Sequence, residues 1–263
     1  MFLLAGDIAL RGGIFLGVLV TLLALEALIG GPNPAPVRGR RWPGNVGLIL
    51  LGTLLVRLVL PVGVVGVAAW AQMRGVGLLN LFESPAWLEL AIALVLLDLA
   101  IYWQHRLLHT LPLLWRLHRA HHTDVTLDAT SALRFHPLEN LLSLGFKIAL
   151  VVLLGVAPLA AMVFEVLLSS FALVTHANLV LPAWLDKPVR ALVVTPNMHR
   201  IHHSTHGDEQ RRNFGFNLSL WDHLFGSYAA HARSQPQDFG VAGVGEPDAS
   251  RLMAMLREPF VRR

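Results

Sequence analysis

The chain has 263 residues, of which 54% are hydrophobic and 14% are charged, whereas an ordinary soluble domain carries about 25% charged residues. A mean hydropathy of +0.56 and a formal net charge of +4 predict an all-helical integral-membrane protein and exclude a nucleic-acid-binding module or a disordered chain. The sequence contains no cysteine, which excludes a disulfide scaffold, a thiolate zinc site and an iron–sulfur cluster held by this polypeptide.

Five apolar stretches are candidates for membrane segments, and we expect four or five crossings because about 20 apolar residues span the hydrocarbon core. The first stretch lacks a basic start and a small-residue cleavage site, so we expect a retained helix rather than a removed signal peptide. The second, interrupted only by Arg57, is the clearest span, and Glu165 separates the last two, which form either two crossings or a hairpin. The stretches are residues 1–30, 46–70, 87–103, 148–164 and 166–185.

The basic residues between these stretches indicate how the protein is oriented, because Lys and Arg near span ends stay in the cytoplasm. The first connection carries Arg38, Arg40 and Arg41, whereas the second carries only Arg74 beside Glu83. With alternate threading, the third helix ends in the cytoplasm. We therefore expect a helical bundle in a bacterial inner membrane or an equivalent membrane, with a polar helical cap on the cytoplasmic side.

Histidine is concentrated in one part of the chain: none of the 13 occurs before His105. His105 and His109 follow Asp98 on one stripe of a helix with 3.6 residues per turn. Two imidazoles at i and i+4 can share a metal ion, with Asp98 as an acceptor behind them. The alternative is that His and Arg here only mark the membrane surface.

The spacing HxxHH occurs twice, and this repetition is the strongest signal in the sequence. On a helix each triplet places three rings on one side. Two triplets and the i, i+4 pair offer more rings than one four-coordinate zinc ion uses, which favours two metal ions. The alternatives are surface histidine runs, or buried histidines capped by backbone carbonyls. The triplets are His118, His121 and His122, and His199, His202 and His203.

Two further histidines are candidate ligands. His176 ends an apolar run of about 20 residues, where a neutral imidazole needs a partner or a metal ion. His136 precedes a helix start signalled by Pro137 and Glu139, so it is expected to ligate, cap or orient a neighbour. His206 and His223 are expected either to support the ligands or to lie at the surface, and His231 is expected at the surface.

Two other classes of function are disfavoured. No glutamate stands where a zinc peptidase of the HExxH kind carries its base, which argues against a hydrolase. A metal transporter places its ligands across several spans near the bilayer midplane, whereas these histidines lie mostly beyond span ends. Imidazole ligands alone do not name the metal.

The order HxxxH, HxxHH, a lone His, HxxHH and then residues 213–228 (NFGFNLSLWDHLFGSY) resembles the fatty acid hydroxylase/sterol desaturase superfamily over about residues 85–230. The resemblance implies two iron ions that activate O₂ to hydroxylate an unactivated C–H bond of an acyl, sterol or isoprenoid lipid; desaturation at the same site is the alternative. Ser227 stands where the superfamily more often has Thr. The implied ligands are His105, His109, His118, His121, His122, His176, His199, His202, His203 and, more weakly, His136. The implied supporting polar residues are Asp98, Glu139, Asn213 and Asp222.

The resemblance also divides the chain into N-terminal membrane helices (1–84), a catalytic region with a membrane hairpin (85–230) and a C-terminal tail (231–263), which we expect to be a mobile surface appendage. No fused electron-transfer domain or dinucleotide-binding fingerprint is visible, so electrons must come from a separate ferredoxin- or cytochrome-type donor. We expect that donor on a basic cytoplasmic face; binding of anionic lipid headgroups is the alternative role of this face. Its arginines are Arg106, Arg116, Arg119, Arg200, Arg211 and Arg212.

Overall fold

The computed structural model describes residues 2–32, 38–233 and 238–261. These residues form helices and loops, with two isolated β-bridges and no strand among them, which confirms the predicted all-helical fold. The long helices are α1 (Phe2–Ile29), α2 (Arg38–Val59), α3 (Gly63–Met73), α4 (Ala86–Thr110), α6 (Pro137–Leu154) and α7 (Pro158–His176). The shorter ones are α5 (Pro112–His122), α8 (Ala183–Val189), α9 (Pro196–His202), α10 (Leu220–Leu224), α11 (Leu252–Arg257) and the 3₁₀ turns η1 (Leu78–Leu81), η2 (Ala129–Leu133) and η3 (Glu258–Phe260).

Five helical segments among the described residues are long and apolar enough to cross a membrane, in agreement with the expected four or five. They are Asp7–Ile29, Arg38–Leu81, Ala86–Thr110, Pro137–Leu154 and Pro158–His176. Large apolar side chains such as Leu16, Val20 and Leu54 point outward from the bundle and are more than half exposed. Outward-facing apolar side chains on long helices face lipid rather than water, so the chain is an integral membrane protein.

Two predicted helix boundaries are wrong. Residues 46–70 do not form one helix, because Pro61 cannot donate a backbone hydrogen bond and disfavours helix at the residue before it; α2 therefore ends at Val59 and α3 begins at Gly63. The last two apolar stretches divide not at Glu165 but at Gly155, which caps α6 in the left-handed conformation (φ 69°). Glu165 lies within α7, where its partners Arg11 and Lys147 make the buried carboxylate tolerable.

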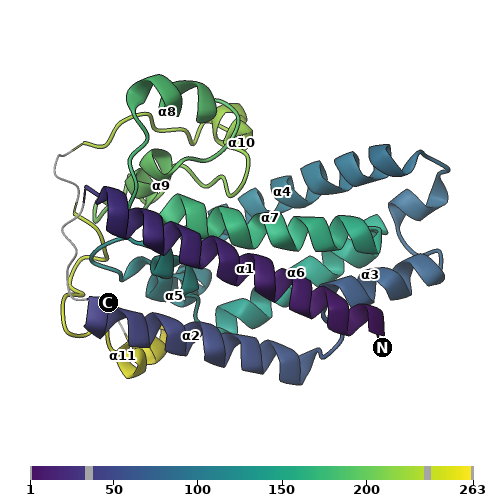
Figure 1. Ribbon diagram of the computed structural model, residues 1–263, viewed down its shortest axis with the longest axis horizontal. Helices are drawn as coiled ribbons and strands as arrows, with labels where there is room; N and C mark the ends of the chain where they lie inside the picture. Colours follow the sequence, from purple (N-terminus) through teal and green to yellow (C-terminus); the bar gives the residue numbers. More distant parts are fainter. Residues whose placement is uncertain (1, 33–37, 234–237, 262–263) are drawn as a thin grey trace.

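The long helices lie roughly lengthwise in the molecule, while α5, α8, α9 and α10 gather at one end, opposite the N-terminus (Figure 1). The packed pairs include α1 with α7, α2 with α6, and α4 with α7. Small buried residues, such as Ala93 on α4 and Ala160 and Ala161 on α7, line the central core. Small side chains let helix backbones approach closely in a membrane. The bundle thereby holds the polar end in a fixed position.

The described part of the C-terminal tail is packed against the bundle, which corrects the expectation of a mobile surface appendage. Met255 of α11 is buried, and the carbonyl oxygen of Ser250 would lie 2.4 Å from a Cβ atom placed on Gly44 of α2. Glu258 forms a 2.8 Å ion pair with Arg119 of α5. The tail thus covers the cytoplasmically predicted end of α2 and one side of α5.

Candidate metal centre

The polar end of the bundle contains two groups of buried histidines whose ligand atoms lie within 4.8 Å of one another inside each group. The first, called here the five-histidine group, comprises His105, His109, His118, His122 and His202. The second, called the four-histidine group, comprises His121, His176, His199 and His203. Nine of the ten histidines proposed as ligands from the sequence therefore come together in two places.

Both HxxHH triplets contribute to both groups. From α5, His118 and His122 enter the five-histidine group, while His121 enters the four-histidine group. From α9 the division is reversed: only His202 enters the five-histidine group. Residues at i and i+4 lie above one another on a helix, whereas the i+3 residue points to one side, and this offset directs each triplet to two adjacent positions. The rings of His122 and His203 stack across the boundary, with centroids 4.2 Å apart.

Ring nitrogens in both groups approach each other too closely, and too many at once, to be explained by hydrogen bonds alone. Nε2 of His176 lies 3.0 Å from Nε2 of His121, 3.1 Å from that of His203 and 3.2 Å from that of His199. A single N–H donates to one of these atoms, not to three. Four imidazoles at about 2.1 Å from a tetrahedral metal ion have their nitrogens about 3.4 Å apart, which is close to this arrangement.

The five-histidine group shows the same convergence. Nε2 of His202 lies 3.0 Å from Nε2 of His105. Nε2 atoms of His109, His118 and His122 are buried without a hydrogen-bond partner among the described residues. Unpaired buried ring nitrogens are costly, and a metal ion would satisfy all of them together. The donor set of both groups, all imidazole nitrogen, suits iron, zinc, copper or nickel.

Hydrogen bonds at the outer nitrogens fix the rings. Nδ1 of His105 lies 2.8 Å from the carbonyl oxygen of Phe214, and Nδ1 of His202 lies 2.8 Å from that of Arg212. On α7, Nδ1 of His176 lies 2.7 Å from the carbonyl oxygen of Ala172. A carbonyl accepts only from Nδ1–H, which leaves Nε2 unprotonated and available to a metal ion.

His118 has a charged partner instead of a carbonyl. Its Nδ1 lies 2.6 Å from Oε1 of Glu139, and both side chains are buried. Carboxylate–histidine pairs of this kind orient the ring and make it a stronger ligand. Glu139 lies in the first turn of α6, next to the five-histidine group. The family resemblance implied a supporting role for this residue.

Burial keeps the histidines beyond the membrane helices neutral. It lowers the pKa of His122 and His203 well below the ordinary value, and their neighbouring rings lower it further. For His202, burial lowers the pKa to about 3. Neutral imidazole is the form that binds metal ions, so these side chains are ready to ligate at neutral pH.

The other three supporting residues lie in or bond to the segment around residues 212–222 rather than bonding directly to a histidine ring. Asp222 accepts hydrogen bonds from the amides of Phe214 and Gly215, at 2.8 and 2.7 Å. Asp98 accepts one from the indole of Trp221, at 2.8 Å. Asp98 and Asp222 together hold residues 212–222 against α4, and with them the two carbonyl groups that orient His105 and His202.

Asn213 lies between those two carbonyl groups. Its φ of 54° is left-handed, a conformation that Asn adopts more readily than most residues. Its side chain bonds to the carbonyl oxygen of Met198 and to the amide of Ala229, at 2.9 and 2.8 Å. Ser227, which replaces the more usual Thr, keeps the hydroxyl and donates it to Asp222 at 2.6 Å.

His136 lies in neither group. It caps the N-terminus of α6, where Nδ1 accepts from the amide of Leu138, and Nε2 lies 3.2 Å from the carbonyl oxygen of Leu256. Both ring nitrogens therefore have protein partners, so the structure supports the capping role over ligation. His206, His223 and His231 are exposed.

A buried ion-pair network around Asp124 was not predicted from the sequence. Asp124, two residues after His122, bonds to the guanidinium of Arg41 at 2.6 and 2.7 Å and lies 3.8 Å from that of Arg134. Burial by itself would raise the pKa of Asp124, but the two arginines hold it below the ordinary value. Arg41 is thus a buried structural cation rather than the surface charge inferred from the connection. The only signal for Asp124 in the sequence is that it follows the first HxxHH triplet by two residues.

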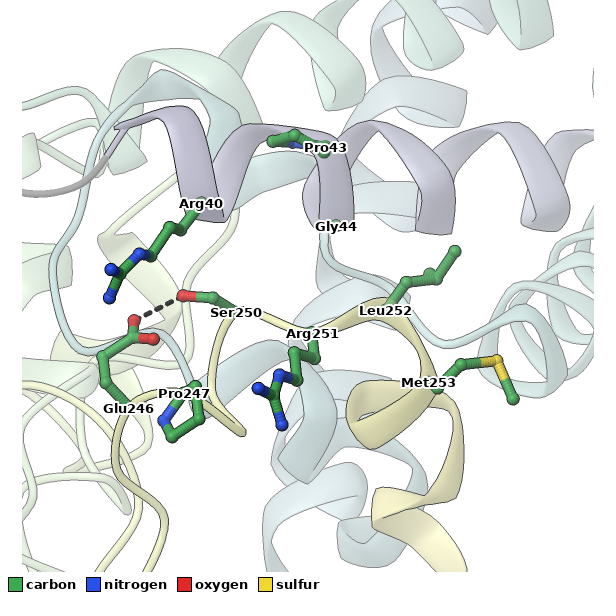
Figure 2. A pocket seen from close by; sticks show the side chains of 9 residues that line it. All are labelled: Arg40, Pro43, Gly44, Glu246, Pro247, Ser250, Arg251, Leu252 and Met253. Atoms are coloured by element: carbon green, nitrogen blue, oxygen red, sulfur yellow. Dashed lines mark hydrogen bonds between the residues drawn. The ribbon is translucent and has the colours of Figure 1, made fainter.

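Hollows lie near this end of the molecule. A cavity of about 350 Å³ reaches between the membrane helices and is lined by His105, His118 and Glu139. A larger open groove, of about 940 Å³, lies between α2 and the tail (Figure 2). The groove is lined by Arg40, Arg251 and residues around them, and by no histidine. Of these hollows, the 350 Å³ cavity is the one that reaches the five-histidine group, because His105 and His118 line it.

The comparisons with known proteins agree with this site. The family pattern described as Fatty acid hydroxylase matches residues 90–227. The chain is 34% identical to the ornithine lipid hydroxylase OlsE of Rhizobium tropici over 186 residues, which are 69% of this chain and 53% of that protein. It is 30% identical to the alkylglycerol monooxygenase of Danio rerio (52% of this chain, 30% of that protein) and 27% identical to sphinganine C4-monooxygenase 1 of Arabidopsis thaliana (58% of each).

The chain spans between 30% and 58% of the length of these three relatives. No solved structure matches it. The matched residues begin within α4 and end at Ser227, so they enclose every member of both histidine groups and the segment that supports them. The chain belongs to the fatty acid hydroxylase family.

Proposed function

We propose that the protein hydroxylates an unactivated C–H bond of a membrane lipid with O₂, using two metal ions bound by the two histidine groups. The observation that carries this proposal is the pair of adjacent all-histidine groups beside a cavity that opens between membrane helices. The activities in the names of the relatives, on ornithine lipid, alkylglycerol and sphinganine, support a lipid substrate and favour hydroxylation over desaturation.

The nine histidines named above would hold the metal ions, which we propose to be iron, as the family resemblance implies. Iron supplies O₂ activation, a reaction that zinc does not catalyse because it has no redox chemistry. One oxygen atom of O₂ would enter the lipid. Two electrons from the donor and two protons would reduce the other oxygen atom to water. His136 serves as a cap in this proposal, and Glu139 keeps His118 oriented.

The protein's own part is placement and exclusion of water. Phe135, whose ring stacks on that of His121 with centroids 4.5 Å apart, and Phe216 line the cavity beside the histidines. Helices α4 and α7 flank the cavity and keep water from the reacting position, and fixed dipoles act strongly in such an enclosed site. A lipid reaches the cavity sideways, without leaving the membrane.

Electrons would come from a separate ferredoxin- or cytochrome-type protein. Two arginines of the proposed docking face are unsuitable, because Arg119 is buried against Glu258 and Arg200 is buried with a hydrogen bond to the carbonyl oxygen of Ala177. Arg106, Arg211 and Arg212 line a surface hollow of about 530 Å³, together with Phe214. We propose this hollow as the docking site, since its Arg212–Phe214 backbone bonds directly to His202 and His105.

We also propose that the polar end of the bundle, with both histidine groups, lies on the cytoplasmic side of a bacterial inner membrane or an equivalent membrane. This orientation rests on Arg38 and Arg40, since Arg41 is buried. The three-part division of the chain into residues 1–84, 85–230 and 231–263 is likewise proposed.

The test is lipid mass spectrometry with purified, iron-loaded protein, a reducing system and ¹⁸O₂. Hydroxylation adds one labelled oxygen atom to a membrane lipid, whereas desaturation removes two hydrogen atoms. Metal analysis is expected to give two iron ions per chain. One zinc ion per chain with no O₂ consumption would contradict the proposal and support a zinc hydrolase.

A further inference from the structure

The cavity that reaches the five-histidine group has an unusual lining for a space between membrane helices. Of its 26 lining residues, 12 have polar or charged side chains. Its volume of about 350 Å³ is at the lower end of small-molecule pockets, which range over roughly 300–1,000 Å³. The cavity therefore takes part of a lipid and not a whole two-chain lipid.

The polar residues form a continuous track away from the histidines. On α6, Glu139, Ser143 and Lys147 are spaced at i, i+4 and i+8, and all three line the cavity; such a spacing places them on one face of the helix. On α7, Ser169 and Glu165 line the facing wall. Apolar side chains such as Val56, Ile101 and Leu144 line the rest of the cavity, so part of an alkyl chain also fits there. The polar side chains of the track can in addition give hydrogen bonds to the polar end of a lipid, which apolar walls alone cannot give.

The far end of the track is charged. Glu165 accepts hydrogen bonds from Nζ of Lys147 and from Nη2 of Arg11, each at 2.6 Å. Glu165 precedes His176 by 11 residues on α7, which is about 16 Å along a helix axis. Ionisable side chains at this depth are expensive and mark functional sites.

Cations exceed anions at this end. Arg11 also lies 3.5 Å from Asp7, so Arg11 and Lys147 together are balanced by two carboxylates. Arg57 lines the same cavity and donates to the carbonyl oxygen of Pro61 at 3.3 Å. No carboxylate among the described residues lies within 4 Å of its guanidinium group, so one positive charge is left uncompensated beside the cavity.

We infer that this cavity binds the polar end of the lipid substrate, with an anionic group, a phosphate or a carboxylate, held by Arg57 beside the Arg11–Glu165–Lys147 cluster. The inference rests on the proposed function for calling the ligand a substrate. The lipid's polar end then lies between the charged cluster and the histidines, and the oxidised carbon belongs to that end of the molecule rather than to the far end of an acyl chain.

The experiment measures binding of four single-chain amphiphiles of equal length to the intact, metal-loaded protein in neutral detergent, by thermal shift and by titration. The probes are dodecyl phosphate, N-dodecanoylglycine, dodecyltrimethylammonium and dodecanol. We expect one or both anionic probes to bind and raise the melting temperature, and the cationic and neutral probes to have no effect. The stronger of the two anionic probes identifies the group as phosphate or carboxylate.

Variants of Arg57 decide whether that binding occurs at this end of the cavity. Loss of one charge-assisted hydrogen bond in Arg57→Gln weakens anionic binding by about tenfold or more, while Arg57→Lys keeps most of it. Glu165→Gln, which removes a negative charge, strengthens it. The matched control is Arg74→Gln, at an exposed arginine after α3, which leaves binding unchanged.

Equal anionic binding by Arg57→Gln and the unaltered protein would overturn the inference, because the probes would then bind elsewhere, for example at the metal ions. Tighter binding of dodecanol than of both anions would also overturn it and identify the cavity as a slot for an alkyl chain. Binding that depends on Arg57 without any lipid oxidation would retain the anion site and refute the proposed function. Lipid oxidation together with anionic binding that does not depend on Arg57 would retain the proposed function and refute the anion site.

Discussion

Replacing Glu139 with Gln tests the most specific contact of the candidate site. The hydrogen bond from Nδ1 of His118 to Oε1 of Glu139 is 2.6 Å long and fully enclosed. A hydrogen bond to a charged group contributes about 1.5–3 kcal/mol, which corresponds to about a ten- to hundredfold change in affinity. Gln keeps the shape of the side chain but removes the charge, so metal binding by the five-histidine group weakens by that factor.

The two groups provide an internal comparison. Metal content is measured after equilibration with a chelator of increasing concentration. The variant is expected to lose one ion per chain at chelator concentrations where the unaltered protein retains two, because Glu139 contacts His118 and no ring of the four-histidine group. Glu246→Gln, an exposed carboxylate in the tail, serves as the control. An unchanged chelator curve, or equal weakening of both ions, would refute the reasoning.

Three further outcomes follow from the structure. His202→Ala is expected to abolish lipid oxidation while the membrane helices stay inserted, whereas His231→Ala, at the surface, leaves activity intact; near-normal turnover of the first variant would exclude His202 as a ligand. Asp124→Asn leaves two buried arginines without their shared carboxylate and is expected to lower the free energy of unfolding by about 3–5 kcal/mol, measured by denaturant titration in mixed micelles; Asp248→Asn, at an exposed position, is the control, and an equal effect of both would contradict the network's role. Metal-free protein is expected to lose stability as the pH falls below about 6.5, because His122 has a folded-state pKa below its unfolded value and the unfolded chain then binds more protons. Each such histidine contributes about 1.4 kcal/mol per pH unit, so melting temperatures recorded between pH 7.5 and 5.5 check the sign, and a constant or rising value would contradict it.

Nine histidines of the candidate site could be predicted from the sequence, because residue type and spacing alone indicate that they can bind metal ions. Histidines at i, i+3 and i+4 lie on one side of a helix. The repetition of this spacing predicts two metal ions. The sequence did not indicate how each triplet divides between the groups, since that depends on how α5 and α9 cross. It also left His136 open, because the Leu256 carbonyl that engages its ring comes from the tail, 120 residues away.

The wrong expectations share a cause. Hydropathy depends on the composition of a segment, and it does not show which hydrogen-bond or ion-pair partners a charged side chain finds in other segments. Arg41, Arg119 and Arg200 were assigned to the surface on charge alone, but each finds buried acceptors in distant segments. Glu165 was taken for a helix boundary, although Arg11 and Lys147 accommodate it inside α7. The broken helix at Pro61 was predictable from proline chemistry, but its apolar neighbours concealed it.

The crossed contribution of α5 and α9 to both histidine groups has a consequence for how the protein would acquire its metal ions. Each histidine group takes ligands from both α5 and α9. Binding of a single metal ion therefore already requires both short helices to lie in their final positions. A change in one motif histidine is therefore expected to weaken the ion of its own group most, and to disturb the stacked or adjacent ring of the other group to a smaller extent.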